Sequence, residues 1–406
     1  MRYKFGDFEL CTETLELRQS TGLVAIEPQV FNLLMHVVEH RDRVISKDEL
    51  IEAIWDGRFV SDSAVSSRIK SARKALGDDG QTQKYIKTLH GRGIRFVAEV
   101  QVANAAEERE STSGASALAN EAPIAGDFVF QDIRFCHSRD GTKVAYAKAG
   151  NGPPLIKTAN WLNHLEFDWQ SPVWSHFFGD IMQGRTLFRY DARGNGLSDW
   201  DVSDFCFERQ VEDLEAVVEA SGLDRFPLFG ISQGCAVSVA YAARHPDKVT
   251  KLVLLGGYAR GWRLSQSEKM QEETEAMGIL IRSGWGRNNS AFRQMFTTLF
   301  MPDAPPQNQD WFNELQRMTT SPENAANLLD ALGNVDAREY LADVKAPTFV
   351  VHCRGDMRVP LSAGQELAAG IPGARFMTLE SNNHIMPSSD PAWASFSSAM
   401  TSFLNE

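Results

Sequence analysis

The sequence predicts a multidomain protein in which a small α+β domain precedes a larger α/β domain with a doubly wound, mostly parallel sheet. A chain of 406 residues is longer than one ordinary hydrophobic core supports. Short strand patterns and then three helix patterns fill residues 1–100, whereas strand and helix patterns alternate through residues 127–406. Residues 101–126 are rich in Ala, Ser, Glu and Gly and have no large apolar period, so we expect a flexible linker there.

The composition argues against several classes of protein. Hydrophobic residues make up 43% of the chain and charged residues 23%, as in globular proteins. The sequence has no apolar run of the roughly 18 residues that a membrane helix needs, so we expect no membrane association. The five cysteines are scattered and form no CxxC pair, which predicts neither a metal site nor a disulfide framework. We expect no cofactor, and a reducing cytoplasm fits this cysteine usage best.

The first 100 residues begin with strands and continue with helices. Short apolar runs alternate with turns in the first 26 residues, which predicts strands. Pro28 opens a first helix pattern, and Ser46 with Glu49 forms a capping-box pattern at the start of a second.

A third helix pattern has two different faces. Its inner face is the apolar stripe Val65, Ile69, Ala72 and Leu76. Its other side carries hydroxyl and amine groups, from Ser63, Ser67, Lys70 and Lys74. A hairpin pattern follows with four basic side chains, Lys84, Lys87, Arg92 and Arg95. Such a helix could dock on its domain by the stripe and offer donors to base edges and phosphates, although charge alone favours a solvated basic face.

The segments VSDSAVSSRIKSARKALGDDG and IKTLHGRGIRFVAEV resemble the winged-helix DNA-binding domain of the OmpR/PhoB-type response regulators. The resemblance covers nearly all of residues 1–100. It implies a winged helix-turn-helix that binds double-stranded DNA, with the third helix in the major groove and the hairpin as the wing. The implied DNA-binding residues are Ser66, Ser67, Arg68, Lys70, Ser71, Arg73, Lys74, Arg92 and Arg95. Those regulators place a phosphorylatable receiver domain before the winged helix, and this chain does not, so we expect a signal other than aspartate phosphorylation.

A nucleophile pattern stands in the second domain. The segment GISQG (residues 230–234) follows an apolar strand pattern and precedes a helix pattern, which is the context of a strained turn that exposes Ser232. Asp356 and His384 follow in that order, each just after a strand pattern. Any one of them could be an ordinary loop residue, but three in this order predict a nucleophile, a general base and its orienting carboxylate.

Residues 128–406 resemble the α/β-hydrolase fold, and the resemblance extends to RYDARGNGLSDW (189–200) and YAARHPDKVTKLVLLGG (241–257). In the place of the family's His-Gly oxyanion dipeptide the chain has Ala159-Asn160. The resemblance implies that the backbone N–H groups of Trp161 and Gln233 form the oxyanion hole.

A helical insertion interrupts the alternation at about residues 258–342, where the family carries a cap. Most of its aromatic side chains are expected to pack the cap's own core. A subset lining an apolar cavity over Ser232 would suit a ligand with an acyl or aromatic part. The expected pocket residues are Trp161, His164, Trp169, Trp262 and Trp285.

Two functions of different classes follow from these patterns. The first is a DNA-binding transcriptional regulator, a homodimer whose hydrolase-like domain binds, and possibly hydrolyses, a small-molecule effector such as an ester or lactone. The second is a serine esterase or lactonase in which the winged helix is secondary. A third reading makes the winged helix a protein-interaction module.

Overall fold

The computed structural model describes residues 2–12, 16–19, 22–24, 26, 28–55, 62–78, 81–89, 92–103, 131–169, 171–264, 268–287 and 289–406. The chain divides into two compact units, Met1–Ile124 and Ala125–Glu406. Each unit buries a separate hydrophobic core. Most of the predicted linker, residues 104–126, lies outside the described residues.

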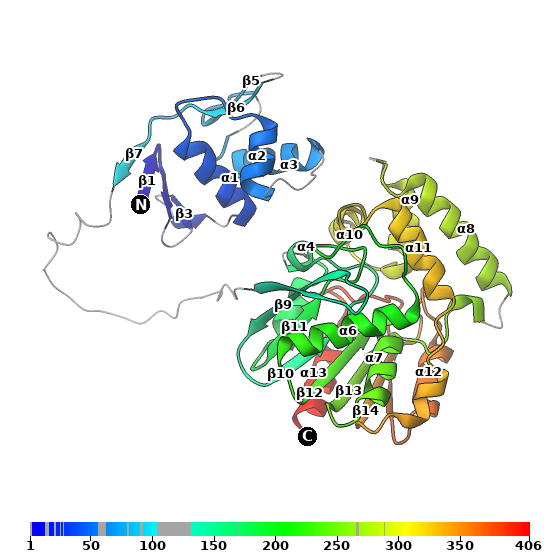
Figure 1. The fold of residues 1–406 in the computed structure, drawn as a ribbon. Coiled ribbons are helices and arrows are strands. Elements are labelled where there is room, and N and C mark those ends of the chain that lie inside the picture. The colour runs from blue at the N-terminus through cyan, green and yellow to red at the C-terminus, as the bar shows by residue number, and fades with distance from the viewer. Residues whose placement is uncertain are drawn as a thin grey trace, which may run out of the picture. The chain divides into compact units, whose positions relative to one another are not determined.

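The first unit combines three helices with a five-stranded antiparallel sheet and a two-stranded hairpin (Figure 1). Its elements are β1 (Arg2–Phe5), β2 (Phe8–Cys11), β3 (Glu16–Gln19), β4 (Gly22–Val24), α1 (Pro28–Glu39), α2 (Lys47–Trp55), α3 (Asp62–Ala75), β5 (Ile86–Leu89), β6 (Gly93–Phe96) and β7 (Gln101–Ala103). The core joins Phe5 and Leu10 of the sheet to Leu34 of α1 and to Val65 and Ala72 of α3. The apolar stripe predicted for the third helix is therefore its docking face.

Strand β7 begins where the sequence predicts a flexible linker. It pairs antiparallel with β1, with Tyr3 opposite Val102. Without β7, β1 would be an edge strand with unpaired backbone groups, and the added strand satisfies them. Composition gives no sign of this pairing because residues 101–103 are too few to form a strand without the sheet edge that receives them.

The second unit is built on an eight-stranded mixed sheet in the order β15-β14-β13-β12-β10-β11-β9-β8. Its strands are β8 (Asp132–His137), β9 (Lys143–Gly150), β10 (Pro154–Lys157), β11 (Thr186–Tyr190), β12 (Phe226–Ile231), β13 (Val249–Leu255), β14 (Thr348–Cys353) and β15 (Arg375–Leu379). The strands from β11 to β15 in this order pair in parallel, and β8 and β9 form an antiparallel edge. The strands β12 and β14 are almost wholly buried, as expected for central strands covered on both faces.

Helices cover both faces of this sheet (Figure 1). They are α4 (Leu165–Trp169), α5 (Ser175–Ile181), α6 (Phe207–Ser221), α7 (Gln233–Arg244), α12 (Leu361–Gly370) and α13 (Pro391–Asn405). On one face, Phe177 of α5 and Phe396 of α13 stack on Phe229 of β12, and Trp393 packs against both helical phenylalanines. Because β12 leads into residue 232, this aromatic cluster fixes the strand that carries the predicted nucleophile.

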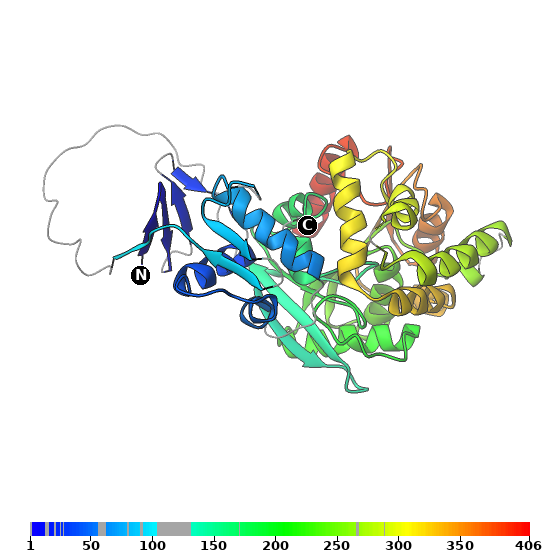
Figure 2. The ribbon, with the colours of Figure 1, turned by 90° about the horizontal axis from the view of Figure 1, so that it is seen from above.

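A helical insertion separates β13 from β14. It consists of η1 (Trp262–Leu264), α8 (Glu268–Gly284), α9 (Ala291–Phe300), α10 (Pro306–Thr319), α11 (Pro322–Gly333) and η2 (Arg338–Asp343). Seen from above, α8 to α11 group together in yellow-green to orange (Figure 2). The fold class predicted from the sequence, an α+β domain followed by an α/β domain with a helical cap, is confirmed.

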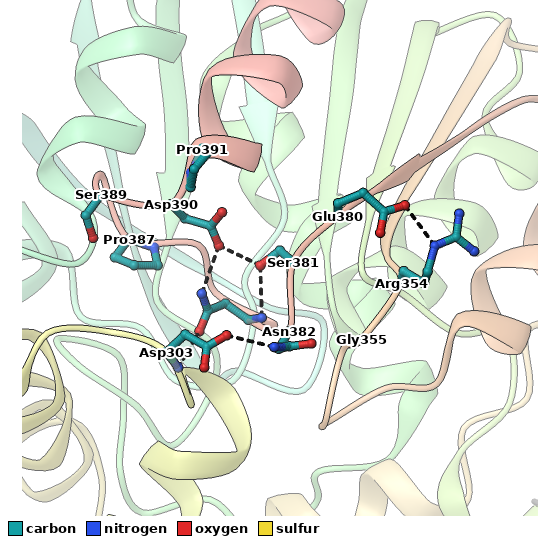
Figure 3. A pocket seen from close by; sticks show the side chains of 11 residues that line it. Asp303, Arg354, Gly355, Glu380, Ser381, Asn382, Pro387, Ser389, Asp390 and Pro391 are labelled. Atoms are coloured by element: carbon teal, nitrogen blue, oxygen red, sulfur yellow. Dashed lines mark hydrogen bonds and ion pairs between the residues drawn. The ribbon is translucent and has the colours of Figure 1, made fainter.

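Hydrogen bonds between the residues that line a polar pocket hold the loop after β15 in place (Figure 3). Asp390 Oδ2 accepts hydrogen bonds from Ser381 Oγ at 2.5 Å and from Asn383 Nδ2 at 2.8 Å. Asn382 Nδ2 donates to Asp303 Oδ2 at 2.8 Å, which ties the same loop to the insertion. These polar groups satisfy one another, so the pocket stabilises the loop that presents residue 384.

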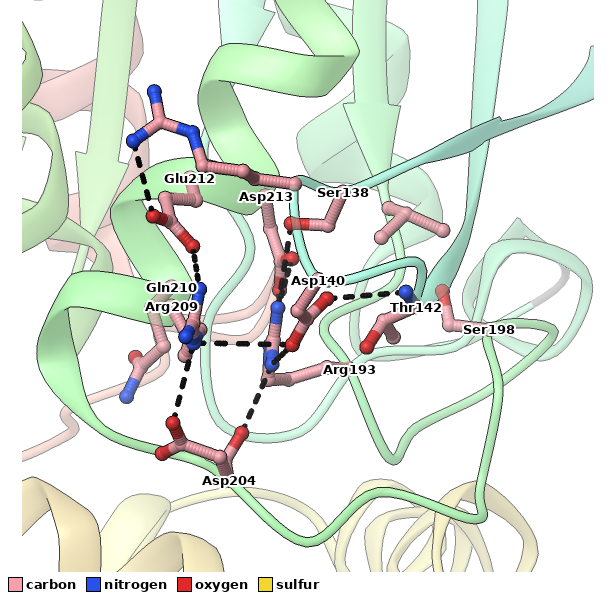
Figure 4. A network of polar contacts seen from close by, with 12 residues as sticks. Ser138, Asp140, Thr142, Arg193, Ser198, Asp204, Arg209, Gln210, Glu212 and Asp213 are labelled. Atoms are coloured by element: carbon pink, nitrogen blue, oxygen red, sulfur yellow. Dashed lines mark hydrogen bonds and ion pairs between the residues drawn. The ribbon is translucent and has the colours of Figure 1, made fainter.

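A buried arginine holds the loop after β11 (Figure 4). Arg193 is fully buried and donates from Nε and Nη2 to the two carboxylate oxygens of Asp213 on α6, at 2.8 and 2.6 Å. Its Nη1 donates to Asp140 Oδ2 and to the carbonyl of Asp204, both at 2.9 Å. Burial alone would raise the pKa of Asp140, but the bond from Arg193 and the N–H of Thr142 hold it well below its usual range.

We expect Arg193→Leu to lower the free energy of unfolding of the second unit by about 3–5 kcal/mol, because Asp213 would remain buried without its partner. Chemical unfolding followed by tryptophan fluorescence measures the change. The matched control is Arg338→Leu, which breaks an exposed pair with Asp336 and should cost less than about 1 kcal/mol. Equal losses in the two variants would contradict this assignment.

Candidate functional site

Ser232 occupies a sharp turn between β12 and α7. Its backbone has φ +53° and ψ −126°, a strained conformation for a residue with a side chain. The flanking glycines permit the close contacts of this turn. An added Cβ at Gly230 would lie 2.8 Å from Cys235 Cα, and one at Gly234 would lie 2.7 Å from the carbonyl oxygen of Ala159. The sequence therefore needs glycine at both positions, and Ser232 stands at the N-terminus of α7 as expected of a nucleophile elbow.

His384 and Asp356 form a buried pair. His384 Nδ1 and Asp356 Oδ2 are 2.7 Å apart, and both side chains are 1% exposed. The other oxygen of Asp356 accepts the backbone N–H groups of Arg358 and Val359 at 2.8 and 2.9 Å. Burial alone would raise the pKa of Asp356, but the charge and hydrogen bond of His384 and the backbone donor outweigh it and lower the pKa. The carboxylate is thus ionised and orients the imidazole.

The turn after β13 borders both His384 and the backbone of Ser232. An added Cβ at Gly256 would lie 3.3 Å from His384 Cε1, and one at Gly257 would lie 3.2 Å from the carbonyl oxygen of Ser232. His384 Nε2 is buried and has no hydrogen-bond partner in the described part of the chain. The hydroxyl of Ser232 is therefore not yet bonded to this nitrogen, as is common before a substrate binds.

The loop that carries His384 is also bonded to the insertion. The backbone N–H groups of His384 and Ile385 both donate to the carbonyl of Phe300, at 2.9 and 3.0 Å. The Phe300 ring stands edge-on to the His384 ring, with centroids 5.4 Å apart. Phe300 is the last residue of α9, so a helix of the insertion helps to position the imidazole.

The two predicted oxyanion-hole residues contact each other. The backbone N–H of Trp161 donates to Oε1 of the Gln233 side chain at 2.8 Å. The amide oxygen of the Gln233 side chain thus occupies the Trp161 N–H, which is one of the two predicted oxyanion-hole donors. For a substrate oxygen to reach that donor, the Gln233 side chain must rotate away.

Buried polar residues stabilise the loop after β10 that contains Asn160 and Trp161. The sequence analysis did not predict their role. Lys157 Nζ donates to Asn160 Oδ1, and Asn160 Nδ2 donates to the carbonyl of Trp161 at 3.2 Å. Burial lowers the pKa of Lys157 and raises that of Asp168, and each charge partly offsets the effect on the other. Asn160, which stands in place of the family's glycine, acts here through its side chain.

A cavity of about 140 Å³ opens next to Ser232 and Gln233. Trp161 and Trp262 are among its lining residues, as expected. Several polar residues that follow β13 and β14 also line it, and the sequence analysis did not single them out: Tyr258, Arg260 and Arg358. Their position directly after two strands that end at the site is the signal that could have found them.

Three of the expected pocket residues do not line this cavity. His164 Nδ1 accepts the N–H groups of Glu166 and Phe167 at the start of α4. Trp169 packs on Phe178 and under the guanidinium of Arg189. Trp285 is 1% exposed and packs edge-on against Trp161 and Phe296, behind the cavity wall. Each ring is taken up by packing or local hydrogen bonds that the residue type alone does not reveal.

The predicted DNA-facing helix, α3, has an accessible basic side. Lys70 and Lys74 are exposed, as are Ser66 on the same helix and Arg92 and Arg95 at the hairpin. Arg68 and Ser71 are half-buried, and the side chain of Ser67 lies outside the described residues.

Arg73 differs from the other predicted DNA contacts. Its guanidinium donates to the carbonyl of Ile86 at 3.0 Å and to Thr88 Oγ1 at 2.7 Å. These bonds join α3 to β5, so Arg73 positions the hairpin beside the helix instead of extending toward a phosphate.

Comparison with known proteins identifies both units. Residues 167–391, more than half of the chain, match the family model described as the alpha/beta hydrolase fold. The chain belongs to the α/β-hydrolase fold family. Residues 21–96 match the model described as the C-terminal domain of transcriptional regulatory proteins. The predicted fusion of an OmpR/PhoB-type winged-helix DNA-binding domain to an α/β-hydrolase domain is therefore confirmed.

Two curated relatives of this α/β-hydrolase chain are named as hydrolases. The 2-hydroxy-6-oxononadienedioate/2-hydroxy-6-oxononatrienedioate hydrolase 2 of Pseudomonas putida is 30% identical over 259 residues, covering 60% of this chain and 82% of that protein. The AB hydrolase superfamily protein YisY of Bacillus subtilis (strain 168) is 27% identical over 247 residues, covering 58% and 86%. The enol-lactonase from Burkholderia xenovorans LB400 shares the fold, with a TM-score of 0.56 and 23% identity, over 67% of this chain and 100% of that one.

Within the described residues, no helix combines the length and the apolar composition that crossing a bilayer requires.

We expect Asp356→Asn to destabilise the second unit by about 1.5–3 kcal/mol near neutral pH, because it removes a buried charge-assisted hydrogen bond. The folded-state pKa of Asp356 is lowered, so its contribution is complete above the unfolded value of about 3.9 and is lost as the pH falls through the folded pKa. The difference between the two proteins should therefore shrink below about pH 4. Unfolding measured at a series of pH values tests this, and a difference that grows on acidification would contradict it. Asp336→Asn, at an exposed pair, is the control and should change little at any pH.

Proposed function

We propose that this protein is a transcriptional regulator that binds DNA through α3 and its hairpin, and whose α/β-hydrolase domain binds and hydrolyses a small ester or lactone effector. The observation that supports the catalytic part is that the strained Ser232 and the buried pair of His384 and Asp356 border the same turn after β13. The hydrolase names of the relatives favour the same chemistry. Protein copies paired on repeated half-sites would supply the contacts that one winged helix lacks.

The reaction follows from the positions of the side chains. Ser232 Oγ attacks the ester carbonyl while its proton passes to His384 Nε2, and Asp356 stabilises the resulting imidazolium. The carbonyl oxygen becomes an oxyanion that accepts the N–H groups of Trp161 and Gln233, once the Gln233 side chain has released the first of them. His384 then protonates the leaving alkoxide. Water, activated by the same imidazole, cleaves the acyl-serine ester and restores the free hydroxyl.

The bond between Trp161 N–H and Gln233 Oε1 favours a second candidate function. A receptor that binds its effector without turnover could keep this bond throughout. In the remaining alternative, a serine esterase or lactonase, the winged helix would be secondary.

Covalent labelling of Ser232 distinguishes a hydrolase from a receptor that binds its ligand without turnover. We expect a fluorophosphonate probe to label the folded protein and short p-nitrophenyl esters to be cleaved. Ser232→Ala should abolish labelling and lower kcat by about 10⁴-fold or more. Ser389→Ala, at an exposed serine in a nearby loop, should change neither. A folded wild-type chain that is not labelled would favour the receptor.

DNA affinity tests the regulatory part. The double variant Lys70→Ala/Lys74→Ala should weaken binding to a promoter fragment and lower the salt slope of binding by about 2, because two phosphate-neutralising charges are lost. The control is Lys269→Ala/Lys345→Ala, which removes two exposed charges from the other unit. Fluorescence anisotropy at several salt concentrations gives both numbers. If the wild-type protein shows no affinity for DNA at low salt, the regulator hypothesis is wrong and the esterase hypothesis remains.

A further inference from the structure

One charged side chain of the cavity has no direct hydrogen-bond or ion-pair partner among the described residues. Arg358 lies in the loop between β14 and α12, two residues after Asp356. Its backbone N–H donates to Asp356 Oδ1 at 2.8 Å, which fixes the start of the side chain relative to the catalytic pair. The side chain lines the same cavity as Ser232.

The guanidinium of Arg358 has no hydrogen bond or ion pair with any described side chain or backbone group. The guanidinium carbon lies over the Phe300 ring, 5.9 Å from its centroid, and this cation–π contact uses none of the N–H donors. Burial lowers the pKa of Arg358, yet a guanidinium remains cationic at any physiological pH. Arg358 is half-buried, and Asp356 is a nearby opposite charge that makes no direct bond to the guanidinium, so its N–H donors can bind a ligand.

A second arginine of the cavity, Arg260, has an ion-pair partner. Arg260 Nε donates to Glu366 Oε2 at 3.2 Å, and both residues line the cavity. That pair is neutral as a whole. Among the described residues of the cavity wall, Arg358 therefore has a guanidinium with free donors, beside apolar surface from Trp161, Trp262 and Leu332.

We propose that Arg358 binds a carboxylate on the effector, so that the ligand of this site is a small anionic ester or lactone. A guanidinium matches a carboxylate with two parallel hydrogen bonds, and that geometry orients a ligand as well as holding it. The cavity volume of about 140 Å³ limits the ligand to a few carbons between the carboxylate and the reacting carbonyl. A comparable cavity of about 150 Å³ accommodates benzene.

This assignment rests on the proposed function, because it supplies the substrate class for hydrolysis at Ser232. Arg358 could instead only steady the loop of Asp356 through its backbone. A structural role of that kind would affect charged and neutral substrates alike, whereas carboxylate binding affects only the charged one.

The test compares two substrates with the same number of non-hydrogen atoms. Monomethyl succinate carries a carboxylate, and methyl succinamate carries a neutral amide in its place. Each is hydrolysed with one water to methanol and the corresponding acid. We expect kcat/KM of the full-length protein to favour monomethyl succinate by about 10- to 100-fold, the range of a charge-assisted hydrogen bond.

Arg358→Gln should abolish this preference, so that the ratio of the two kcat/KM values falls to about one. Arg358→Lys keeps the charge without the paired donors and should retain part of the preference. The matched control is Arg354→Gln, four residues earlier, where an exposed arginine pairs with Glu380. It should leave the preference unchanged. Wild-type protein without a preference, or a preference that survives in Arg358→Gln, would overturn the assignment.

A binding measurement keeps this result separate from the proposed catalysis. If fluorophosphonate labelling shows no reactive serine, hydrolysis at Ser232 fails as a function. In that case the melting temperature, measured with each succinate derivative at millimolar concentration, tests Arg358 alone. Stabilisation by monomethyl succinate that exceeds that by methyl succinamate, and that disappears in Arg358→Gln, supports the carboxylate site. Equal stabilisation by the two compounds refutes it.

Discussion

Asp356 is a buried carboxylate whose two oxygens receive donors from different segments of the chain. One oxygen meets His384 Nδ1, and the other meets the backbone N–H groups at the start of the loop that leads to α12. An ionised carboxylate at 1% exposure persists only with such compensation. The loops after β14 and β15 must therefore converge at one edge of the sheet. That convergence places the imidazole beside the Gly256-Gly257 turn, which the backbone carbonyl of Ser232 also approaches.

Much of the fold could be predicted because its signals are local. The stripe of Val65 and Ala72 follows from helical periodicity, and the elbow at Ser232 follows from two glycines between a strand and a helix. Asp356 and His384 could be selected as partners of Ser232 because each comes just after a predicted strand. In each case the residues that decide the outcome lie within one element or directly after it.

The remaining features depend on where a side chain points after the elements have packed. Arg73 belongs to the basic side of its helix by sequence, but Ile86 and Thr88 capture its guanidinium. Trp285 is one aromatic residue among many in the insertion, and only the assembled fold shows that it packs behind Trp161, which itself lines the cavity. Arg358 is notable because its guanidinium has no hydrogen-bond or ion-pair partner among the described residues, and a sequence pattern does not show whether a side chain finds a partner.

The bond from the His384 backbone to the Phe300 carbonyl has a mechanical consequence. Because α9 ends at the residue that holds the loop of His384, the insertion cannot move away from the sheet as a rigid body without pulling on His384, the proposed base. An oversized ligand that wedges α9 outward would thus be retained and yet escape hydrolysis. Under the proposed function, the size of a ligand would then decide whether the compound is hydrolysed or only bound.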